Sequence, residues 1–162
     1  MRVFTEAQRF TQWWLSVILI ATFAIVLVTS YNTYQEIAKD SNAVLSLIAS
    51  NIITPLVILL IYGLKLKTKI NEQGIFYGFW PFHLKMKNIA WSQIEKIYVR
   101  EYNPILEYGG WGYKFSFNKR GKAYTTKGNI GIQIEFKDGK KMLLGTQKRV
   151  EAESVINSYK YI

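Results

Sequence analysis

The sequence predicts a helical hairpin in a membrane, followed by one small, mostly β domain that a C-terminal helix closes. Three observations predict this fold class: two long uncharged apolar segments near the N-terminus, a period-two alternation of apolar and polar residues after residue 65, and one amphipathic helical pattern near the end. A helix of about 20 residues crosses the ~30 Å hydrocarbon core of a bilayer, and each apolar segment has that length.

The two spans are expected at about 13–31 and 43–64, inside a hairpin that occupies residues 1–64. An uncleaved first span is favoured over a signal peptide, because a second span follows within a dozen residues and only 28–30 offers a weak cleavage site. Asn51 and Thr54 lie close to one face of the second span. They are expected to hydrogen-bond Ser16 or Thr22 of the first span, or a helix of another protein.

The basic residues favour one orientation of the hairpin. They flank its outer ends: Arg2, Arg9, Lys65, Lys67 and Lys69. The connecting loop offers only Lys39, so both termini are expected in the cytoplasm of a multi-pass cell-membrane protein. Residues 1–64 carry three basic and three acidic side chains, so the whole net charge of +10 belongs to residues 65–162. The chain has no cysteine, which excludes disulfides and thiolate metal sites and suits the reducing cytoplasm.

Residues 65–162 are expected to form a single cytoplasmic domain, a strongly bent sheet or partial barrel. Roughly seven short strands are expected, near 66–70, 75–79, 84–89, 94–100, 114–117, 130–136 and 141–144, with a further short one at 123–126. Asp138–Gly139 predicts a two-residue turn with both residues at positive φ. A helix opens at Thr146 or Gln147, and its apolar stripe covers one open end of the sheet. The stripe is Ala152, Val155, Ile156 and Tyr159.

Several local segments carry a family resemblance. The stretch 88–97 contains Trp-Ser-Gln-Ile and is similar to a Trp-Ser-x-Ile segment that leads into a central strand. The segments 107–113, 128–131, 138–141 and 145–147 add to the likeness. Together with the hairpin, the chain resembles one uncharacterised branch of the bacterial pleckstrin-homology-like membrane proteins, although Arg149 stands where that branch has proline. The resemblance implies fold and location and brings no activity, since a fold does not fix function.

The basic surface of the domain is the first candidate site. Its residues are Lys85, Lys87, Lys119, Arg120, Lys122 and Lys127, with Lys140 and Lys141 nearby. Each charge that approaches an anionic leaflet contributes about 1 kcal/mol. Anionic lipid headgroups are therefore candidate ligands, but unspecific resting against the membrane is favoured over a headgroup pocket. Nucleic acid is not expected as a partner, because the segment 112–117 only faintly resembles an RNA-binding strand.

Two loops are further candidates. The run Gly109, Gly110, Trp111 and Gly112 is followed by a strand rather than a helix, so a tight loop between strands, with Trp111 packed on its neighbours, is expected instead of a phosphate loop. It is also the first candidate for a loop that recognises a partner. The run 79–82 is aromatic, and its rings are expected in the core rather than in the membrane interface.

Catalysis finds little support in the sequence. His83, the single histidine, is expected in a strand as a structural residue, and no acidic pair or metal-ligand cluster has a recognisable spacing. We therefore expect no enzyme, no metal and no cofactor. The expected function is a non-catalytic, membrane-anchored binding or scaffold module for lipid or for a membrane or cytoplasmic protein. The alternative is a subunit of a transport or envelope-assembly complex that works through its hairpin.

Overall fold

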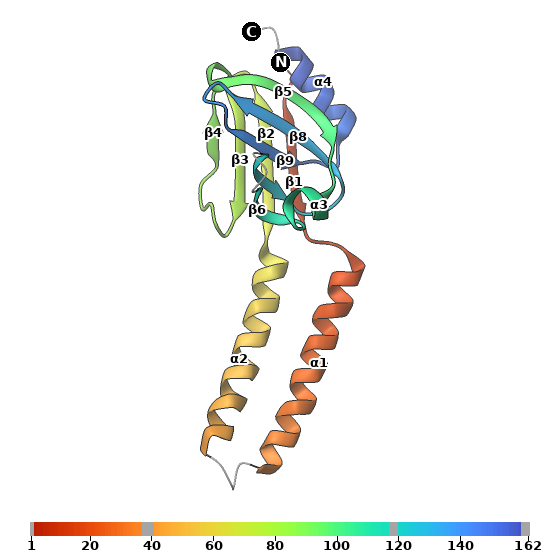
Figure 1. The fold of residues 1–162 in the computed structure, drawn as a ribbon, viewed down its shortest axis with the longest axis vertical. Coiled ribbons are helices and arrows are strands. Elements are labelled where there is room, and N and C mark those ends of the chain that lie inside the picture. Colours follow the sequence, from red (N-terminus) through yellow and green to blue (C-terminus); the bar gives the residue numbers. More distant parts are fainter. Residues whose placement is uncertain (1, 37–40, 117–119, 160–162) are drawn as a thin grey trace. The chain divides into compact units, whose positions relative to one another are not determined.

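The computed structural model describes residues 2–36, 41–116 and 120–159. It contains two compact units (Figure 1). One is the helical hairpin, Thr11–Gly63. The other, here called the β domain, combines Met1–Phe10 with Leu64–Ile162.

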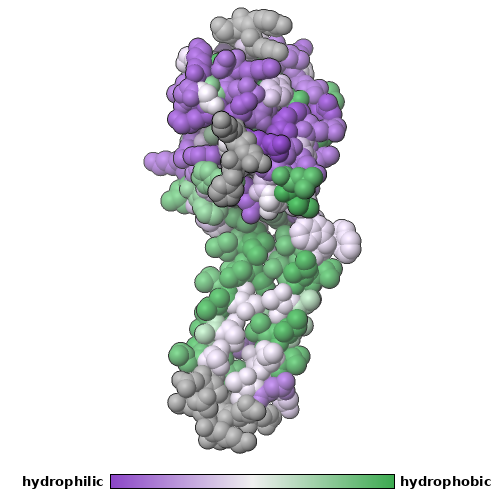
Figure 2. Space-filling view, viewed as in Figure 1, coloured by the Kyte–Doolittle hydropathy of each residue, from purple (hydrophilic) through white to green (hydrophobic). Residues whose placement is uncertain are grey.

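The hairpin consists of α1 (Trp13–Glu36) and α2 (Ser41–Gly63), which contact each other. Within them, Trp13–Tyr34 and Val44–Gly63 are long and apolar enough to cross a membrane. At 1.5 Å per residue, 20 residues reach about 30 Å. Their apolar side chains are largely exposed, and Figure 2 shows a mostly hydrophobic surface on these helices. The predicted hairpin of two apolar helices is confirmed.

Polar side chains of the hairpin bond within the hairpin. Asn51 Nδ2 donates to Ser30 Oγ of α1 at 2.7 Å and to the Leu47 carbonyl of its own helix at 2.9 Å. Tyr62 donates its hydroxyl to Ser16 Oγ at 3.1 Å. The partner of Asn51 is therefore Ser30 rather than Ser16 or Thr22. Such pairing lowers the cost of polar groups in lipid.

The first sheet of the β domain, sheet A, is antiparallel throughout and has the order β1-β2-β3-β4. Its strands are β1 (Phe4–Arg9), β2 (Lys65–Asn71), β3 (Gly74–Trp80) and β4 (Lys87–Ile89). Residues 4–9, which the sequence analysis counted with the hairpin, pair with β2 from Phe4↔Ile70 to Arg9↔Lys65. The helical hairpin is thus inserted in the sequence between two neighbouring strands of one sheet.

The second sheet, sheet B, has the order β5-β8-β9-β7-β6. Its strands are β5 (Ile94–Glu101), β6 (Gly112–Ser116), β7 (Gly121–Thr125), β8 (Ile130–Phe136) and β9 (Lys141–Gly145). All pairs are antiparallel except β7 with β9, which is parallel. The short helix η1 (Trp91–Gln93) leads into β5, which is an edge strand of this sheet rather than the predicted central one.

One core joins the two sheets and the C-terminal helix α4 (Arg149–Tyr159). Leu66 and Phe79 of sheet A and Ile132 and Leu144 of sheet B are buried in it. The predicted apolar stripe of α4 is buried as expected: Ala152, Val155, Ile156 and Tyr159. Each fully buried aliphatic or aromatic side chain contributes about 1.5–3 kcal/mol of hydrophobic stabilisation.

Polar side chains of β1 fasten sheet A to sheet B. The buried Glu6 carboxylate accepts hydrogen bonds from the Thr146 hydroxyl at 2.7 Å and from the Gln147 backbone N–H at 2.9 Å. Gln8 Nε2 donates to the Gly145 carbonyl at 2.7 Å. Buried polar groups of this kind are tolerated because each finds a partner.

Three details differ from expectation. The predicted mostly β domain closed by a C-terminal helix is confirmed, but it has two open sheets in place of one bent sheet or partial barrel. The β8–β9 turn has three residues, because Phe136 N–H donates to the Lys140 carbonyl and Gly139 N–H to the Phe136 carbonyl, both at 2.9 Å. Gly139 takes the left-handed conformation that closes such loops (φ 80°). Finally, α4 begins at Arg149, two or three residues later than predicted.

Candidate functional site

A hollow of about 900 Å³ opens in the β domain between η1, the facing ends of β6 and β7, and the β8–β9 turn. We call it the basic hollow. Its lining residues fall into an apolar group, Phe115, Phe136 and Met142, and a charged group, Lys122, Lys137, Asp138, Lys140 and Lys141. Ser92, Gln93 and Ser116 add hydroxyl and amide groups. This volume lies in the range of about 300–1,000 Å³ that small-ligand sites occupy.

Two of the four lysines of the basic hollow are bound to carboxylates. Lys140 Nζ lies 2.6 Å from Asp138 Oδ2, and Lys141 Nζ lies 3.3 Å from Glu135 Oε1. The hydrogen bond from Lys140 lowers the pKa of the Asp138 carboxyl, and the one from Tyr98, followed by Lys141, lowers that of Glu135. Both carboxylates are therefore charged at neutral pH.

The other two lysines, Lys122 and Lys137, have no carboxylate partner among the described residues. Lys122 Nζ lies 5.3 Å from the centre of the Phe115 ring, a distance at which an ammonium group is attracted to an aromatic face. The lining of the basic hollow thus combines apolar side chains with two lysines that lack carboxylate partners among the described residues. Chemically, it suits an anionic group that carries some apolar surface.

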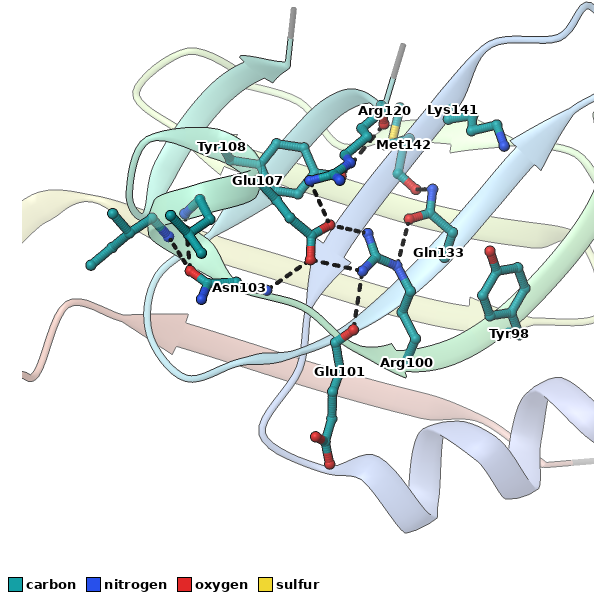
Figure 3. A network of polar contacts seen from close by, with 12 residues as sticks. Tyr98, Arg100, Glu101, Asn103, Glu107, Tyr108, Arg120, Gln133, Lys141 and Met142 are labelled. Carbon is teal, nitrogen blue, oxygen red and sulfur yellow. Dashed lines mark hydrogen bonds and ion pairs between the residues drawn. The ribbon is translucent and has the colours of Figure 1, made fainter. Parts of the chain in front are cut away.

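A second, smaller hollow of about 300 Å³ lies beside it, lined by Tyr98, Arg100, Glu107, Arg120, Gln133, Glu135 and Lys141. Figure 3 shows the polar network there. Arg100 binds both oxygens of Glu107, with Nη2 to Oε2 at 2.8 Å and Nη1 to Oε1 at 3.2 Å. Its Nε donates to Gln133 Oε1 at 3.0 Å, and Gln133 donates to the Met142 carbonyl at 3.2 Å.

Both carboxylate oxygens of Glu107 accept hydrogen bonds. Besides Arg100, the Asn103 backbone N–H donates to Oε1 at 2.8 Å, and Arg120 Nη1 lies 3.7 Å from Oε2. Burial acts to raise the pKa of Glu107, but the hydrogen bonds from Arg100 and Asn103 outweigh it and the pKa is lowered. A carboxylate held in this way has little capacity left for a ligand. The network instead attaches the short helix α3 (Pro104–Tyr108) to β5 and β8.

The glycine-rich loop follows α3, and side-chain hydrogen bonds of Asn103 and Trp111 fix the helix before it and the loop itself. Asn103 Oδ1 accepts from the Ile105 and Leu106 N–H groups at the start of α3, and Gly109 ends the helix in the left-handed conformation (φ 70°). Trp111 Nε1 donates to the Gly128 carbonyl at 2.8 Å. The strand β6 follows at Gly112, so the loop is short, but it joins the helix α3 to a strand and not two strands as predicted.

The structure separates the predicted basic residues. Lys122 lines the basic hollow, and Arg120 lies in the Glu107 network. Lys85 and Lys87 lie between β3 and β4 or at the start of β4, and Lys127 follows β7. Lys119 lies outside the described residues. Lys137 was not among the predicted basic residues, because its place in the polar β8–β9 turn is the ordinary one for a solvated lysine.

His83 is enclosed by aromatic rings. The centres of the Tyr77, Tyr124 and Tyr113 rings lie 5.6, 5.4 and 6.4 Å from that of His83. Its Nδ1 accepts from the Phe79 N–H at 3.4 Å. Burial, and then Lys87 and Lys122, lower its pKa, so the ring is neutral at pH 7. His83 was expected in a strand, but it lies in the β3–β4 loop.

Among the described residues, no group of three or more His, Cys, Asp or Glu side chains is arranged to hold a metal ion. No protein-family model, curated protein or solved structure matches this chain.

Proposed function

We propose that this chain is a non-catalytic binding or scaffold module, anchored by its hairpin in the cell membrane and binding an anionic partner in the basic hollow. The single observation that carries the proposal is the lining of the basic hollow, where apolar side chains lie together with Lys122 and Lys137, which lack carboxylate partners among the described residues. Anchoring in two dimensions raises the effective concentration of such contacts. An anionic lipid headgroup or an acidic segment of a protein fits this chemistry. A pleckstrin-homology-like assignment of the β domain belongs to the same proposal, supported by the open sheets and the terminal helix.

The pairing of β1 with β2 supports a hairpin whose two ends lie on one side of the membrane. Residues 4–9 and 65–71 are hydrogen-bonded partners, so they share one compartment. Arg2, Arg9 and Lys65 flank the spans, which favours the cytoplasm. Because the chain has no cysteine, Gln73→Cys gives a unique label site. Membrane-impermeant maleimide is expected to label it in spheroplasts only after permeabilisation.

The chemistry of the carboxylates supports a non-catalytic role. Glu107 and Glu135 are engaged by donors and have lowered pKa values, the opposite of the raised values that a general acid needs. His83 is neutral and accepts from a backbone N–H. The alternative, a complex subunit that works through its hairpin, has less support, because Asn51 already has its partner on α1.

The test is co-purification of the full chain in mild detergent, with mass spectrometry of the proteins and lipids retained. The variant Lys122→Gln/Lys137→Gln removes the two lysines that lack carboxylate partners. Its matched control is Lys67→Gln/Lys69→Gln, which removes the same charge from exposed positions of β2.

Loss of one retained anionic lipid or acidic protein in the Lys122/Lys137 variant, with retention in the control, is the expected result. Equal retention in both variants would place binding elsewhere. Loss of a protein partner after Asn51→Leu alone, with the basic hollow intact, would transfer the function to the hairpin.

A further inference from the structure

The segment between β3 and β4 exposes an unusual set of apolar side chains. From residue 80 to residue 86, every second position is a large hydrophobic residue at the surface: Trp80 (45% exposed), Phe82 (59%), Leu84 (87%) and Met86 (41%). Single exposed apolar residues are ordinary, but four within seven consecutive positions form a patch, and such patches mark interaction sites. We call this segment, residues 80–87, the apolar loop.

The apolar loop is a built element of the domain. The His83 N–H donates to the Phe79 carbonyl at 2.8 Å, and the His83 ring accepts from the Phe79 N–H. The ring of Phe82 lies over that of Phe79 with centres 6.1 Å apart, and its edge meets Tyr113 at 5.5 Å. His83 points into the aromatic cluster, whereas the next residue, Leu84, is 87% exposed.

Register places the base of the apolar loop at the membrane end of sheet A. Trp80 pairs with Lys65, and Lys65 pairs with Arg9, so these three residues form one row across the sheet. The row is the last one before the chain enters the helices. Leu64 alone separates α2 from β2, and one residue spans at most about 3.6 Å. Lys65 therefore lies next to the end of α2, and Trp80 lies one strand, about 4.8 Å, from Lys65.

The charges around the apolar loop match a lipid surface. In the row, Lys65 is the cross-strand neighbour of Trp80 and Arg9 lies on the far side of Lys65, and Lys85 and Lys87 alternate with the apolar side chains of the loop. None of these four has a carboxylate partner among the described residues. Aromatic rings favour the headgroup region, and cations beside them bind lipid phosphates.

We propose that the apolar loop inserts Phe82 and Leu84 into the boundary between headgroups and acyl chains of the same bilayer that holds the hairpin. Trp80 lies at headgroup level, and Lys85 and Lys87 contact lipid phosphates. The β domain is then held at the membrane by three connections, two covalent and one by insertion. This inference depends on membrane insertion of the helices and not on any ligand in the basic hollow.

The test uses the absence of cysteine from the chain. Leu84→Cys is labelled with an environment-sensitive fluorophore, and the full chain is reconstituted into phosphatidylcholine–phosphatidylglycerol vesicles with or without a nitroxide on the lipid acyl chains. The control is Gln73→Cys in the β2–β3 turn, which lies at the other end of the seven-residue strand β2 from the row of Trp80, about 20 Å from that row at 3.3 Å per residue. Leu84 is exposed, so its replacement leaves the core intact; an unchanged melting temperature verifies this.

The expected result is a blue-shifted emission at position 84 that nitroxide lipids quench several-fold more than the emission at position 73. An aqueous emission spectrum at position 84 with no extra quenching would overturn the proposal. A blue-shifted spectrum that nitroxide lipids leave unchanged would also overturn it, because a protein surface rather than lipid would then cover the loop.

Discussion

Replacing Glu107 with glutamine tests the structural role of the network in Figure 3. Glu107→Gln keeps the size and one acceptor oxygen of the side chain but removes its charge. It also places an NH2 group against a guanidinium that has only donors to offer. Arg100 then loses a bond of 2.8 Å to a carboxylate oxygen in a partly buried position.

The expected loss of unfolding free energy in Glu107→Gln depends on the charged character of the lost hydrogen bond and on the solvent exposure of its two side chains. A hydrogen bond to a charged group contributes about 1.5–3 kcal/mol. The Glu107 and Arg100 side chains are 14% and 25% exposed, so water compensates for part of the loss. We expect the free energy of unfolding of the β domain to fall by about 2 kcal/mol at pH 7. At about 4 °C per kcal/mol for a domain of roughly 100 residues, its melting temperature falls by about 8 °C.

The assay is thermal unfolding of the full chain in detergent, followed by near-ultraviolet circular dichroism, with Glu101→Gln as the matched control. Glu101 makes an exposed pair with Arg149 at 3.1 Å, so the same substitution there should cost less than about 1 kcal/mol. In the folded chain, the pKa of Glu107 lies below the ordinary value of about 4.5 for a glutamate side chain. Its stabilisation is therefore complete above pH 4.5 and is lost as the pH falls through the lower, folded pKa. The gap between wild type and Glu107→Gln should narrow over that acid window.

Equal melting temperatures for the Glu107 and Glu101 variants at pH 7 would refute this reasoning. So would a gap between wild type and Glu107→Gln that keeps its full size through the acid window.

Three further predictions concern the β domain. A Cβ at Gly121, which has φ 77°, would collide with the backbone carbonyl oxygen of Lys141. Gly121→Ala should therefore destabilise the parallel pairing of β7 with β9 by several kcal/mol, on the order of the larger core substitutions. An unchanged unfolding midpoint would contradict this. Burial raises the pKa of Tyr102 to about 12, so its contribution to stability is complete below pH 10 and declines as the pH rises through 12; alkaline unfolding curves of Tyr102→Phe should be flatter there than those of wild type. Glu6→Ala leaves the Thr146 hydroxyl without its acceptor and should cost about 2–3 kcal/mol, whereas no effect on the melting temperature would mean that β1 is not docked.

The hairpin and most strands follow from the sequence because long apolar runs and period-two alternation are direct consequences of burial. The strand β1 does not follow in this way. Two of its three inward positions, Glu6 and Gln8, are polar, so the alternation that marks a strand is hidden. Their partners, at Gly145 and Thr146, lie more than 130 residues away. Only the folded chain brings such partners together.

The candidate site is less predictable still. The sequence shows many lysines but not which of them lack carboxylate partners, because Glu135 and Asp138 neutralise Lys141 and Lys140 through contacts that depend on strand register. The aromatic run 79–82 was expected in the core, yet only Phe79 is buried there while Trp80 and Phe82 are exposed. Alternation continues past the end of β3, and nothing in the local pattern tells which side of it meets solvent.

The insertion of the hairpin between β1 and β2 sets an order of events during synthesis. β1 leaves the ribosome first and has no partner until residues 65–71 follow, by which time both helices have been made. A chain that inserts only one of its helices leaves β1 and β2 on opposite sides of the membrane. Such a chain cannot complete sheet A, and it exposes the edge of β2 to aggregation and proteolysis. Sheet A can therefore be completed only in a chain whose β1 and β2 lie in the same compartment.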